Sequence, residues 1–437
     1  MEKVNVIGAG LAGCEAAWQL ATAGVNVTLY EMKPKRKSPA HSSDLFAELV
    51  CSNSLKAARA DSAAGLLKEE MRRLGSLLLN VADGCSVPAG GALAVDRDRF
   101  SEEVTKRICN HENITVCYDE VTEIPRSGIT IVATGPLTDG ALAEDIKELC
   151  GSDYLSFFDA AAPIVTADSI DMSIAFRASR YGRGDDDYIN CPFNRAEYEE
   201  FHKELTEAEG ASLHGFDKEP KVYEGCMPIE VLARRGLDAA RFGPMKPVGL
   251  TDPRTGHRPW AAVQLRTEND SGTLYNLVGF QTNLKFGEQK RVFSMIPGLE
   301  NAEFVRYGVM HRNSFINSPR LLSSDFSLKS NGNIYFCGQL SGVEGYMESA
   351  SSGIIAARAV LKKLSGKKPT VFPNFTMLGA LSGYISDGSV KSFQPMGANF
   401  GILPPLETKI RDKRERYAAL AKRALKWYDE NINDRTI

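Results

Sequence analysis

The stretch from residue 4 to residue 31 constrains the fold of this chain more than any other part of the sequence. Residues 4–7 are typical of a short buried strand, residues 8–13 read Gly-Ala-Gly-Leu-Ala-Gly, and residues 14–23 favour a helix. A second strand is predicted over residues 25–30. A strand, a glycine turn, a helix and a strand in this order indicate a dinucleotide-binding fold, because Gly-x-Gly-x-x-Gly then joins the first strand to the first helix.

Each glycine of the motif has a predicted task. Gly8 allows a sharp turn, Gly10 lets backbone N–H groups approach a pyrophosphate, and Gly13 lets the helix pack against the strand. The N-terminus of the helix faces the phosphates with its partial positive charge. Glu31 ends the second strand, where a carboxylate accepts hydrogen bonds from an adenosine ribose. The predicted dinucleotide site therefore consists of Gly8, Ala9, Gly10, Leu11, Ala12, Gly13 and Glu31.

Composition excludes several classes of protein. The 437 residues are 43% hydrophobic and 24% charged, which predicts a globular protein of two or three domains. The absence of a charge-free apolar run of eighteen residues argues against a membrane span or a signal peptide. Nine scattered cysteines without a Cys-x-x-Cys pair suit a reducing cytoplasm and predict no metal site. The net charge of −3 means that any RNA contact needs a local basic surface.

Two later segments resemble flavoproteins of the glutathione-reductase type. A predicted strand over residues 129–133 runs into Ala-Thr-Gly, and another over residues 333–337 leads into a glycine turn and a helix. The second segment adds Gly338, Gln339, Gly342 and Gly345 to the predicted FAD site. We therefore expect an α/β protein with a Rossmann-like FAD-binding domain from residues 1–150 and 321–437. Because glycine and proline punctuate residues 151–320, a mixed α/β substrate or RNA domain is predicted to be inserted there.

Five stretches resemble the folate- and FAD-dependent tRNA uracil-5-methyltransferases: residues 8–13, 49–54, 224–230, 281–285 and 338–346. Many flavoproteins share the glycine motif, and the last two stretches also resemble the larger tRNA wobble-uridine modification flavoprotein. The two cysteine-containing stretches are the specific part of the resemblance. The resemblance implies bound FAD, methylenetetrahydrofolate and NAD(P)H as co-substrates, and the T-loop uridine 54 of tRNA as the target.

The implied chemistry needs two reactive groups. Uracil C5 becomes nucleophilic once a thiolate has added to C6, and the methylene carbon of the folate then bonds to C5. A base removes the C5 proton, and reduced flavin supplies a hydride. Cys51 and Cys226 fill the two roles in this family. We favour Cys51 as nucleophile and Cys226 as base, although the sequence leaves their order open. The remaining cysteines are interpreted as small buried residues.

The resemblance also suggests residues for the folate. The imidazole of His311 can stack on a pterin, although a lone histidine is equally consistent with a structural role. Lys285 and Arg291 are candidates for holding the glutamate carboxylates of the folate.

A basic stretch near the C-terminus is the candidate RNA surface. Residues 408–426 contain eight basic and two acidic residues and are predicted to form one helix. Tyr417, Leu420, Ala424 and Trp427 or Tyr428 would dock the helix and leave its cations outward. Lys409, Arg411 and Lys413 are the predicted tRNA contacts, and the basic loop 33–37 is the next candidate. A solvated terminal helix is the alternative interpretation.

Other functions remain open at this point. The same chemistry on a ribosomal RNA uridine is the nearest alternative, since any RNA could present one flipped base. A thiol-disulfide flavin oxidoreductase is disfavoured, because the sequence has neither a redox cysteine pair nor a second nucleotide motif. A non-catalytic flavin-binding RNA scaffold is disfavoured by the paired cysteine stretches. The sequence does not indicate an oligomeric state.

Overall fold

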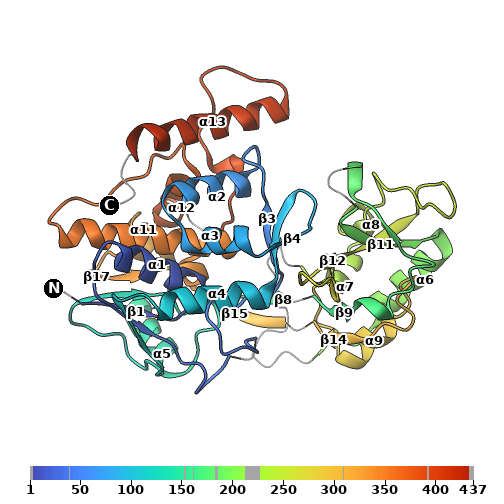
Figure 1. Cartoon of the computed structure of the whole chain (residues 1–437), viewed down its shortest axis with the longest axis horizontal. Coiled ribbons are helices and arrows are strands. Elements are labelled where there is room, and N and C mark those ends of the chain that lie inside the picture. The colour runs from blue at the N-terminus through green and yellow to red at the C-terminus, as the bar shows by residue number, and fades with distance from the viewer. Residues whose placement is uncertain are drawn as a thin grey trace.

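Two separate hydrophobic cores organise the molecule (Figure 1). The larger core draws on residues 4–150 and 315–428, and the smaller core draws on residues 165–302. We call the two parts the large domain and the inserted domain. The structure is a computed structural model, and it describes residues 3–38, 40–151, 154–160, 162–182, 186–211, 227–308, 310–390 and 393–432.

A six-stranded sheet lies at the centre of the large domain, in the order β16-β17-β7-β1-β2-β6. All neighbours are parallel except β16 and β17. Valine and isoleucine dominate the central strands and are buried, as expected where helices cover both faces of a parallel sheet. The strands are β1 (Val4–Ile7), β2 (Val27–Tyr30), β6 (Ile114–Cys117), β7 (Ile129–Val132), β16 (Ser327–Leu328) and β17 (Asn331–Phe336).

Helices cover the sheet in layers (Figure 1). Helices α1 (Leu11–Thr22) and α11 (Tyr346–Leu364) cross on one face, and α5 (Gly140–Cys150) lies on the other. The crossing is close, since a Cβ at Gly353 would lie 2.3 Å from the Ala12 carbonyl oxygen. The other helices of the large domain are α2 (Ala63–Arg73), α3 (Leu77–Gly84), α4 (Arg97–Cys109), α10 (Ser318–Leu321), α12 (Met377–Ser386) and α13 (Lys413–Asn431).

Two buried glutamates each hold the N-terminus of a distant helix. The carboxylate of Glu15 on α1 accepts hydrogen bonds from Ser76 Oγ and from the first N–H groups of α3. The carboxylate of Glu70 on α2 accepts from the first two N–H groups of α12 and from the Tyr428 hydroxyl of α13. Burial raises the pKa of each carboxyl to about 7. These contacts fix helices that lie far apart in the sequence.

An antiparallel sheet forms the inserted domain, in the order β10-β11-β12-β13-β9-β14. Its strands are β9 (Ile164–Thr166), β10 (Phe176–Arg177), β11 (Tyr188–Phe193), β12 (Ala261–Thr267), β13 (Leu274–Leu277) and β14 (Phe304–Arg306). Its helices are α6 (Arg195–Glu207), α7 (Ile229–Ala233), α8 (Ala239–Phe242) and α9 (Phe286–Phe293). The two domains together confirm the predicted α/β class, with a Rossmann-like domain and a mixed inserted domain.

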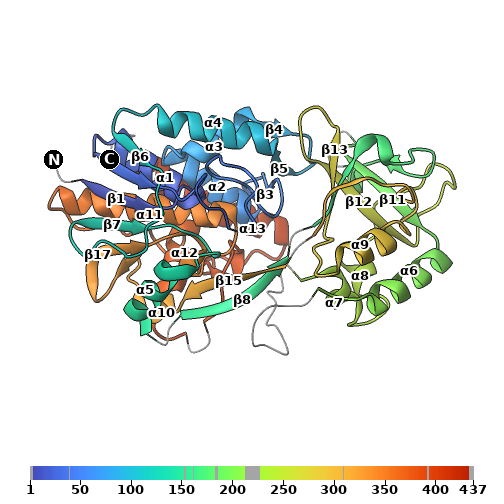
Figure 2. The same ribbon diagram turned by 90° about the horizontal axis from the view of Figure 1, so that it is seen from below.

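Two smaller sheets lie near the junction between the domains. Strands β8 (Tyr154–Ala160) and β15 (Met310–Ile316) form an antiparallel ribbon that leads from the large domain toward the inserted one (Figure 2). Strands β3 (Ser54–Ala57), β4 (Ser86–Val87) and β5 (Ala92–Val95) form a three-stranded sheet. Among the described residues, no helix has the length and apolar character needed to cross a membrane.

The C-terminal helix differs from its prediction at both ends. It begins after Asp412, whose side chain accepts a hydrogen bond from the Glu415 N–H at 2.8 Å and so caps the helix. Lys409 and Arg411 therefore precede the helix rather than belong to it, and the helix continues to residue 431. The predicted docking face is confirmed, since Leu420, Ala424 and Tyr428 are buried.

Candidate active site

A cleft opens where the strands β1, β2 and β7 end. Its walls combine the first glycine turn, the end of β2, the residues after β7 and the turn before α11. In an open parallel sheet, this is the edge at which ligands bind. The residues that line it include Gly8, Ala9, Gly10, Leu11, Ala12, Glu31, Lys33, Arg36, Val50, Thr134, Gly135, Pro136, Gly338, Gln339, Tyr346 and Ser349.

The three glycines of the first turn have different surroundings. Gly8 has φ +98°, and a Cβ there would lie 2.7 Å from the Ala133 carbonyl oxygen. A Cβ at Gly13 would lie 1.8 Å from the Gly8 carbonyl oxygen, so this glycine lets α1 approach the turn. A Cβ at Gly10 would meet no atom within 4 Å, because Gly10 faces the open cleft at the N-terminus of α1. The turn thus leaves room for a phosphate group at a helix N-terminus.

Glu31 is held at the position predicted for a ribose contact. Its side chain is 6% exposed and borders the cleft. One carboxylate oxygen accepts the Ala9 N–H and the other accepts the Lys33 N–H, both at 2.9 Å. The glycine turn, the helix N-terminus and this carboxylate together fit an adenine dinucleotide.

In the second predicted cofactor segment, residues 338–345, two residues line the cleft and two shape the turn behind it. Gly338 and Gln339 line the cleft, whereas Gly342 and Gly345 are not among the residues that line it. Gly342 has φ +81°, and a Cβ there would lie 2.4 Å from the ring of Phe393. Gly345 has φ +122° and precedes the first residue of α11. These two glycines shape the turn that brings Gly338 and Gln339 to the cleft.

Cys51 lies in a loop that adjoins the cleft. The preceding residue, Val50, lines the cleft, and so does Tyr346 at the start of α11. The Tyr346 hydroxyl accepts the N–H groups of Cys51 at 2.7 Å and Ser52 at 3.1 Å. Burial raises the pKa of the Tyr346 phenol, so it remains protonated. Cys51 thus lies in an irregular loop before β3, and the Tyr346 hydroxyl holds the backbone of that loop.

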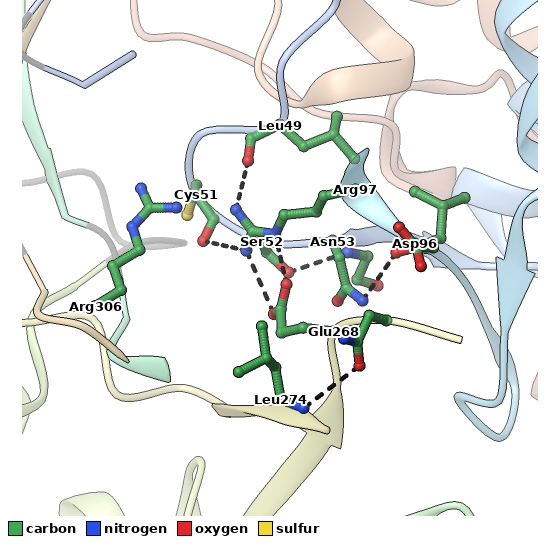
Figure 3. Close-up of polar contacts among 12 residues, drawn as sticks. Leu49, Cys51, Ser52, Asn53, Asp96, Arg97, Glu268, Leu274 and Arg306 are labelled. Carbon is green, nitrogen blue, oxygen red and sulfur yellow. Dashed lines mark hydrogen bonds and ion pairs between the residues drawn. The ribbon is translucent and has the colours of Figure 1, made fainter. Parts of the chain in front are cut away.

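Three arginines contact this loop, which we call the Cys51 loop (residues 49–53), and Figure 3 labels two of them, Arg97 and Arg306. Arg97 of α4 donates to the carbonyl oxygens of Leu49 and Cys51. Arg306 of β14 donates to the Val50 carbonyl oxygen, and Figure 3 shows its guanidinium pointing toward Cys51. Arg266 of β12 donates to Ser52 Oγ at 2.7 Å and to Asn53 Oδ1 at 3.0 Å. Cations beside a cysteine favour its thiolate form, which is the nucleophilic form.

Both domains hold the Cys51 loop. Glu268, which follows β12 of the inserted domain, forms a bidentate ion pair with Arg97 of the large domain. The buried amide of Asn53 donates to the carbonyl oxygens of Val95 at 3.0 Å and Thr267 at 2.9 Å. All hydrogen-bonding atoms of the Asn53 side chain therefore have partners from the two domains.

Comparison with known proteins places this arrangement in a family. The family described as "Glucose inhibited division protein A" matches residues 3–368. The chain belongs to this family. A relative from Acetivibrio thermocellus, named "Methylenetetrahydrofolate--tRNA-(uracil-5-)-methyltransferase TrmFO", is 60% identical over 433 residues, which are 99% of each chain. A relative of the same name from Desulfitobacterium hafniense is 56% identical over 430 residues, or 98% of each chain.

A solved member of the glucose inhibited division protein A family has the same fold. The crystal structure of GidA from Aquifex aeolicus aligns with a TM-score of 0.69 at 17% sequence identity. The alignment covers 98% of this chain and 73% of the Aquifex chain. At this identity the similarity supports the fold alone.

The second cysteine stretch lies partly outside the described residues, which omit 212–226 and therefore Cys226. The residues that follow it are anchored to the stretch 281–285. The Ile229 N–H donates to the Gln281 carbonyl oxygen at 2.7 Å. The buried Glu230 carboxylate accepts from the Thr282 hydroxyl and the Asn283 N–H, both at 2.8 Å. Two stretches of the resemblance thus contact each other directly.

The predicted folate residues lie on two different segments of the chain. His311 is in β15 opposite Asp159, and its side chain is outside the described part of the structure. Lys285 forms an ion pair with Glu209. Arg291 forms ion pairs with Glu204 and Glu288, and these carboxylates raise its pKa. Neither cation is among the residues that line the cleft, and their role in folate binding stays a prediction.

Most of the other cysteines are buried as interpreted. Burial raises the pKa of the thiols of Cys14, Cys85, Cys191 and Cys337. Cys150 is also buried, whereas Cys117 is half-buried. Cys109 is exposed, so its interpretation as a buried residue was wrong. It is the last residue of α4 and lies off the buried face that Phe100, Val104 and Ile108 form.

The two predicted RNA surfaces differ in how far their charge is neutralised. Lys409, Arg411 and Lys413 are all exposed. In the basic loop 33–37, by contrast, Lys33 is buried, and ion pairs join Lys35 to Asp119, Arg36 to Glu120 and Asp139, and Lys37 to Asp44. The loop therefore offers little free positive charge for a phosphate.

Sequence reasoning missed the residues that hold the Cys51 loop. Arg97, Arg266, Arg306 and Tyr346 come from four separate elements. One signal was present: Arg266 directly follows Ala-Ala-Val-Gln-Leu, four of whose five residues are apolar, and a buried arginine needs a partner. The other two arginines have no local pattern that separates them from surface residues.

Proposed function

We propose that this chain methylates C5 of a uracil in tRNA, with methylenetetrahydrofolate as the carbon donor and FAD as the bound cofactor. The identity of 55–60% to full-length relatives of that name supports the proposal most directly. We take uridine 54 of the T-loop as the target and NAD(P)H as the reductant. A tRNA substrate places the protein in the cytoplasm.

The cleft residues divide the binding of FAD among them. The N–H groups of the first glycine turn would hold the pyrophosphate, Glu31 the ribose, and Gly338 with Gln339 the end that approaches the Cys51 loop. Bound FAD, once reduced, supplies the hydride that completes the methyl group. Because Val50 and Tyr346 line the same cleft, the reaction would take place beside Cys51.

We assign Cys51 as the nucleophile. Its thiolate forms a bond to uracil C6 and leaves electron density at C5, which then attacks the methylene carbon of the folate. The proton on C5 goes to a base, for which we propose Cys226, and the two bonds from the methylene carbon to the folate nitrogens break, so that tetrahydrofolate leaves. The sulfur–C6 bond breaks when the product is released. Arg97 and Arg306 stabilise the thiolate, and the Tyr346 hydroxyl fixes the loop that carries it.

Methylation of defined transcripts tests the function. The purified protein with methylenetetrahydrofolate and NAD(P)H should methylate a tRNA transcript, and it should leave unmethylated the same transcript with cytidine at position 54. A ribosomal RNA transcript is the comparison for the alternative target. Methylation of the ribosomal transcript with none of the tRNA would overturn the proposal.

Two substitutions test the cysteines. Cys51→Ala and Cys226→Ala should each abolish methylation and leave flavin absorbance unchanged. The exposed Cys109, which does not line the cleft, gives the matched control Cys109→Ala, which should keep its activity. Only the nucleophile variant should fail to form a covalent adduct with RNA that carries 5-fluorouridine. Normal turnover by either active-site variant would reject the two-cysteine mechanism.

We also propose that Lys409, Arg411 and Lys413 contact tRNA phosphates. Their exposure supports this proposal. Their position supports it too, because the next residue, Arg414, forms an ion pair with Asp61, which lies shortly after β3 and so on the same part of the chain as the Cys51 loop. The triple alanine variant should weaken tRNA binding and flatten its salt dependence, since each phosphate contact contributes a slope of about −0.7 to −0.9. Alanine at Lys367 and Lys368, two exposed lysines after α11, is the control. Equal affinity and slope in both variants would move the RNA site elsewhere.

A further inference from the structure

Three aromatic side chains form a stack at the surface of the inserted domain. The ring centroids of Phe286 and Tyr307 lie 5.0 Å apart with 16° between the planes. Those of Tyr307 and Phe304 lie 5.5 Å apart with 15° between the planes. Phe286, at the outer end, is 57% exposed. We call these three residues the aromatic stack.

Only the inner ring of the aromatic stack belongs to the packing of the core. Phe304 packs against the core of the inserted domain, whereas Phe286 and Tyr307 are not among the described residues of that core. Exposed large apolar side chains are common only singly on a protein surface. An exposed ring that is held in a stack with two half-buried ones therefore indicates a binding surface.

Hydrogen bonds fix the two segments that carry the rings. The side chain of Gln289 is buried on α9, three residues after Phe286. Its amide accepts the Gly308 N–H at 2.8 Å and donates to the Gly308 carbonyl oxygen at 2.8 Å. Gly308 follows Tyr307 directly. The stack is thus formed before a ligand arrives, which lowers the entropy cost of binding.

Arg306 connects the segment that carries the aromatic stack to the Cys51 loop. Arg306, between Phe304 and Tyr307, donates to the Val50 carbonyl oxygen and points toward Cys51 (Figure 3). A ligand on the stack would therefore lie beside a substrate that reaches Cys51.

A polar hollow borders the inner part of the aromatic stack. Its lining consists of Lys290, Ser294, Glu300, Asn301, Ala302, Glu303, Phe304 and Tyr307. The carboxylates of Glu300 and Glu303 would repel a phosphate but can accept the N–H groups of a nucleobase. Lys290 lies one helical turn after Phe286 and makes no ion pair within the described part of the chain. The surroundings thus suit a base on the rings and a phosphate at Lys290.

We propose that the aromatic stack receives an unpaired nucleobase of the RNA substrate, next to the uracil that reaches Cys51. This inference rests on the proposed function. A uracil must leave the base stack of the RNA to meet a cysteine, and its neighbour then loses a stacking partner. An aromatic side chain replaces that partner for any base, because every base has a π-face.

Variants of Phe286 test the aromatic stack. Phe286→Ala and Phe286→Leu should each weaken tRNA binding about tenfold, since stacking on one ring contributes at this order. Phe286→Tyr should bind like the wild type, because it keeps the ring. Phe242→Ala is the matched control, since Phe242 is 73% exposed on α8 of the same domain and outside the stack. Thermal unfolding should be the same for all four variants.

A fluorescent base shows whether stacking is the contact. A T-arm hairpin with 2-aminopurine beside the target uridine should lose fluorescence on binding the wild type and Phe286→Tyr, and less on binding Phe286→Leu. Wild-type affinity of Phe286→Ala, or equal binding by Phe286→Leu and Phe286→Tyr, would overturn the proposal. Failure of the wild type to methylate tRNA would refute the proposed function instead, and the binding measurements would still decide on the aromatic stack.

Discussion

Replacement of Glu268 by Gln tests whether the inserted domain fixes the Cys51 loop. The Glu268 side chain is 3% exposed, and that of its partner Arg97 is 15% exposed. Glutamine keeps the size and one acceptor oxygen but removes the charge, so the Arg97 cation stays buried opposite a neutral amide. Loss of one partner from a buried ion pair costs about 3–5 kcal/mol. Because one hydrogen bond can remain, we expect a loss of about 3 kcal/mol.

The same helix supplies a matched control. Glu103 pairs with Arg107 at 2.7 Å on α4, and both side chains are 35% exposed. An exposed pair of this kind stabilises a fold much less than a buried one, because water screens the two charges. Glu103→Gln therefore removes the same charge from the same kind of pair at the surface. The comparison isolates the effect of burial between the two domains.

Thermal unfolding of the two variants gives the measurement. One kcal/mol corresponds to about 2–4 °C in Tm for a domain of about 200 residues. Glu268→Gln should lower Tm by about 6 °C or more, whereas Glu103→Gln should lower it far less. Equal shifts in the two variants would refute the conclusion that this ion pair holds the domains against the Cys51 loop.

Three further variants test other parts of the site and fold. Gly10→Val should remain folded but lose flavin absorbance, because a Cβ there meets only the open cleft; full flavin absorbance would contradict the assignment of the turn. Tyr346→Phe leaves the N–H groups of Cys51 and Ser52 without their acceptor, so it should lower the free energy of unfolding by about 1–3 kcal/mol. The loosened loop should also make alkylation of Cys51 faster, and an unchanged alkylation rate would count against the role of the hydroxyl. The pKa of the Glu70 carboxyl is raised to about 7 in the folded state, so the stability from this group is full below about pH 4.5 and is lost as the pH rises through about 7. The Tm of Glu70→Gln should therefore fall less than that of the wild type between pH 5 and 8, and parallel profiles would argue against this titration.

The first part of the fold could be predicted because its signals are local. The apolar residues of β1, the glycine turn and the helix that follows lie within one short stretch, and the structure has β1 at the predicted residues. The docking face of α13 could be predicted for the same reason, since Leu420, Ala424 and Tyr428 follow a helical period. The start of α13 could not, because the cap at Asp412 depends on one side chain within a continuous run of charged residues.

The surroundings of Cys51 depend on contacts that a linear pattern does not contain. Asn53 and Thr267 are joined by a hydrogen bond across 214 positions, and Cys51 and Tyr346 by one across 295. Charged residues such as Lys285 and Arg291 have the right chemistry for a folate carboxylate, but their type does not show that each pairs with a glutamate of the inserted domain. Residue type therefore indicated which groups could bind a ligand, and the tertiary structure was needed to show which residues surround them.

The split of the large domain around the inserted one sets the order in which the chain can fold on the ribosome. Strand β7 ends at Val132, and its parallel neighbour β17 is complete only at Phe336, about 200 residues later, or roughly 10–40 s at normal rates of synthesis. During that time one edge of the central sheet has no neighbour. The core of the inserted domain uses residues 165–302 alone and can close first. The segment that is translated in the middle can therefore fold before the central sheet is complete, and Gly338 and Gln339 are the last of these residues to reach the cleft.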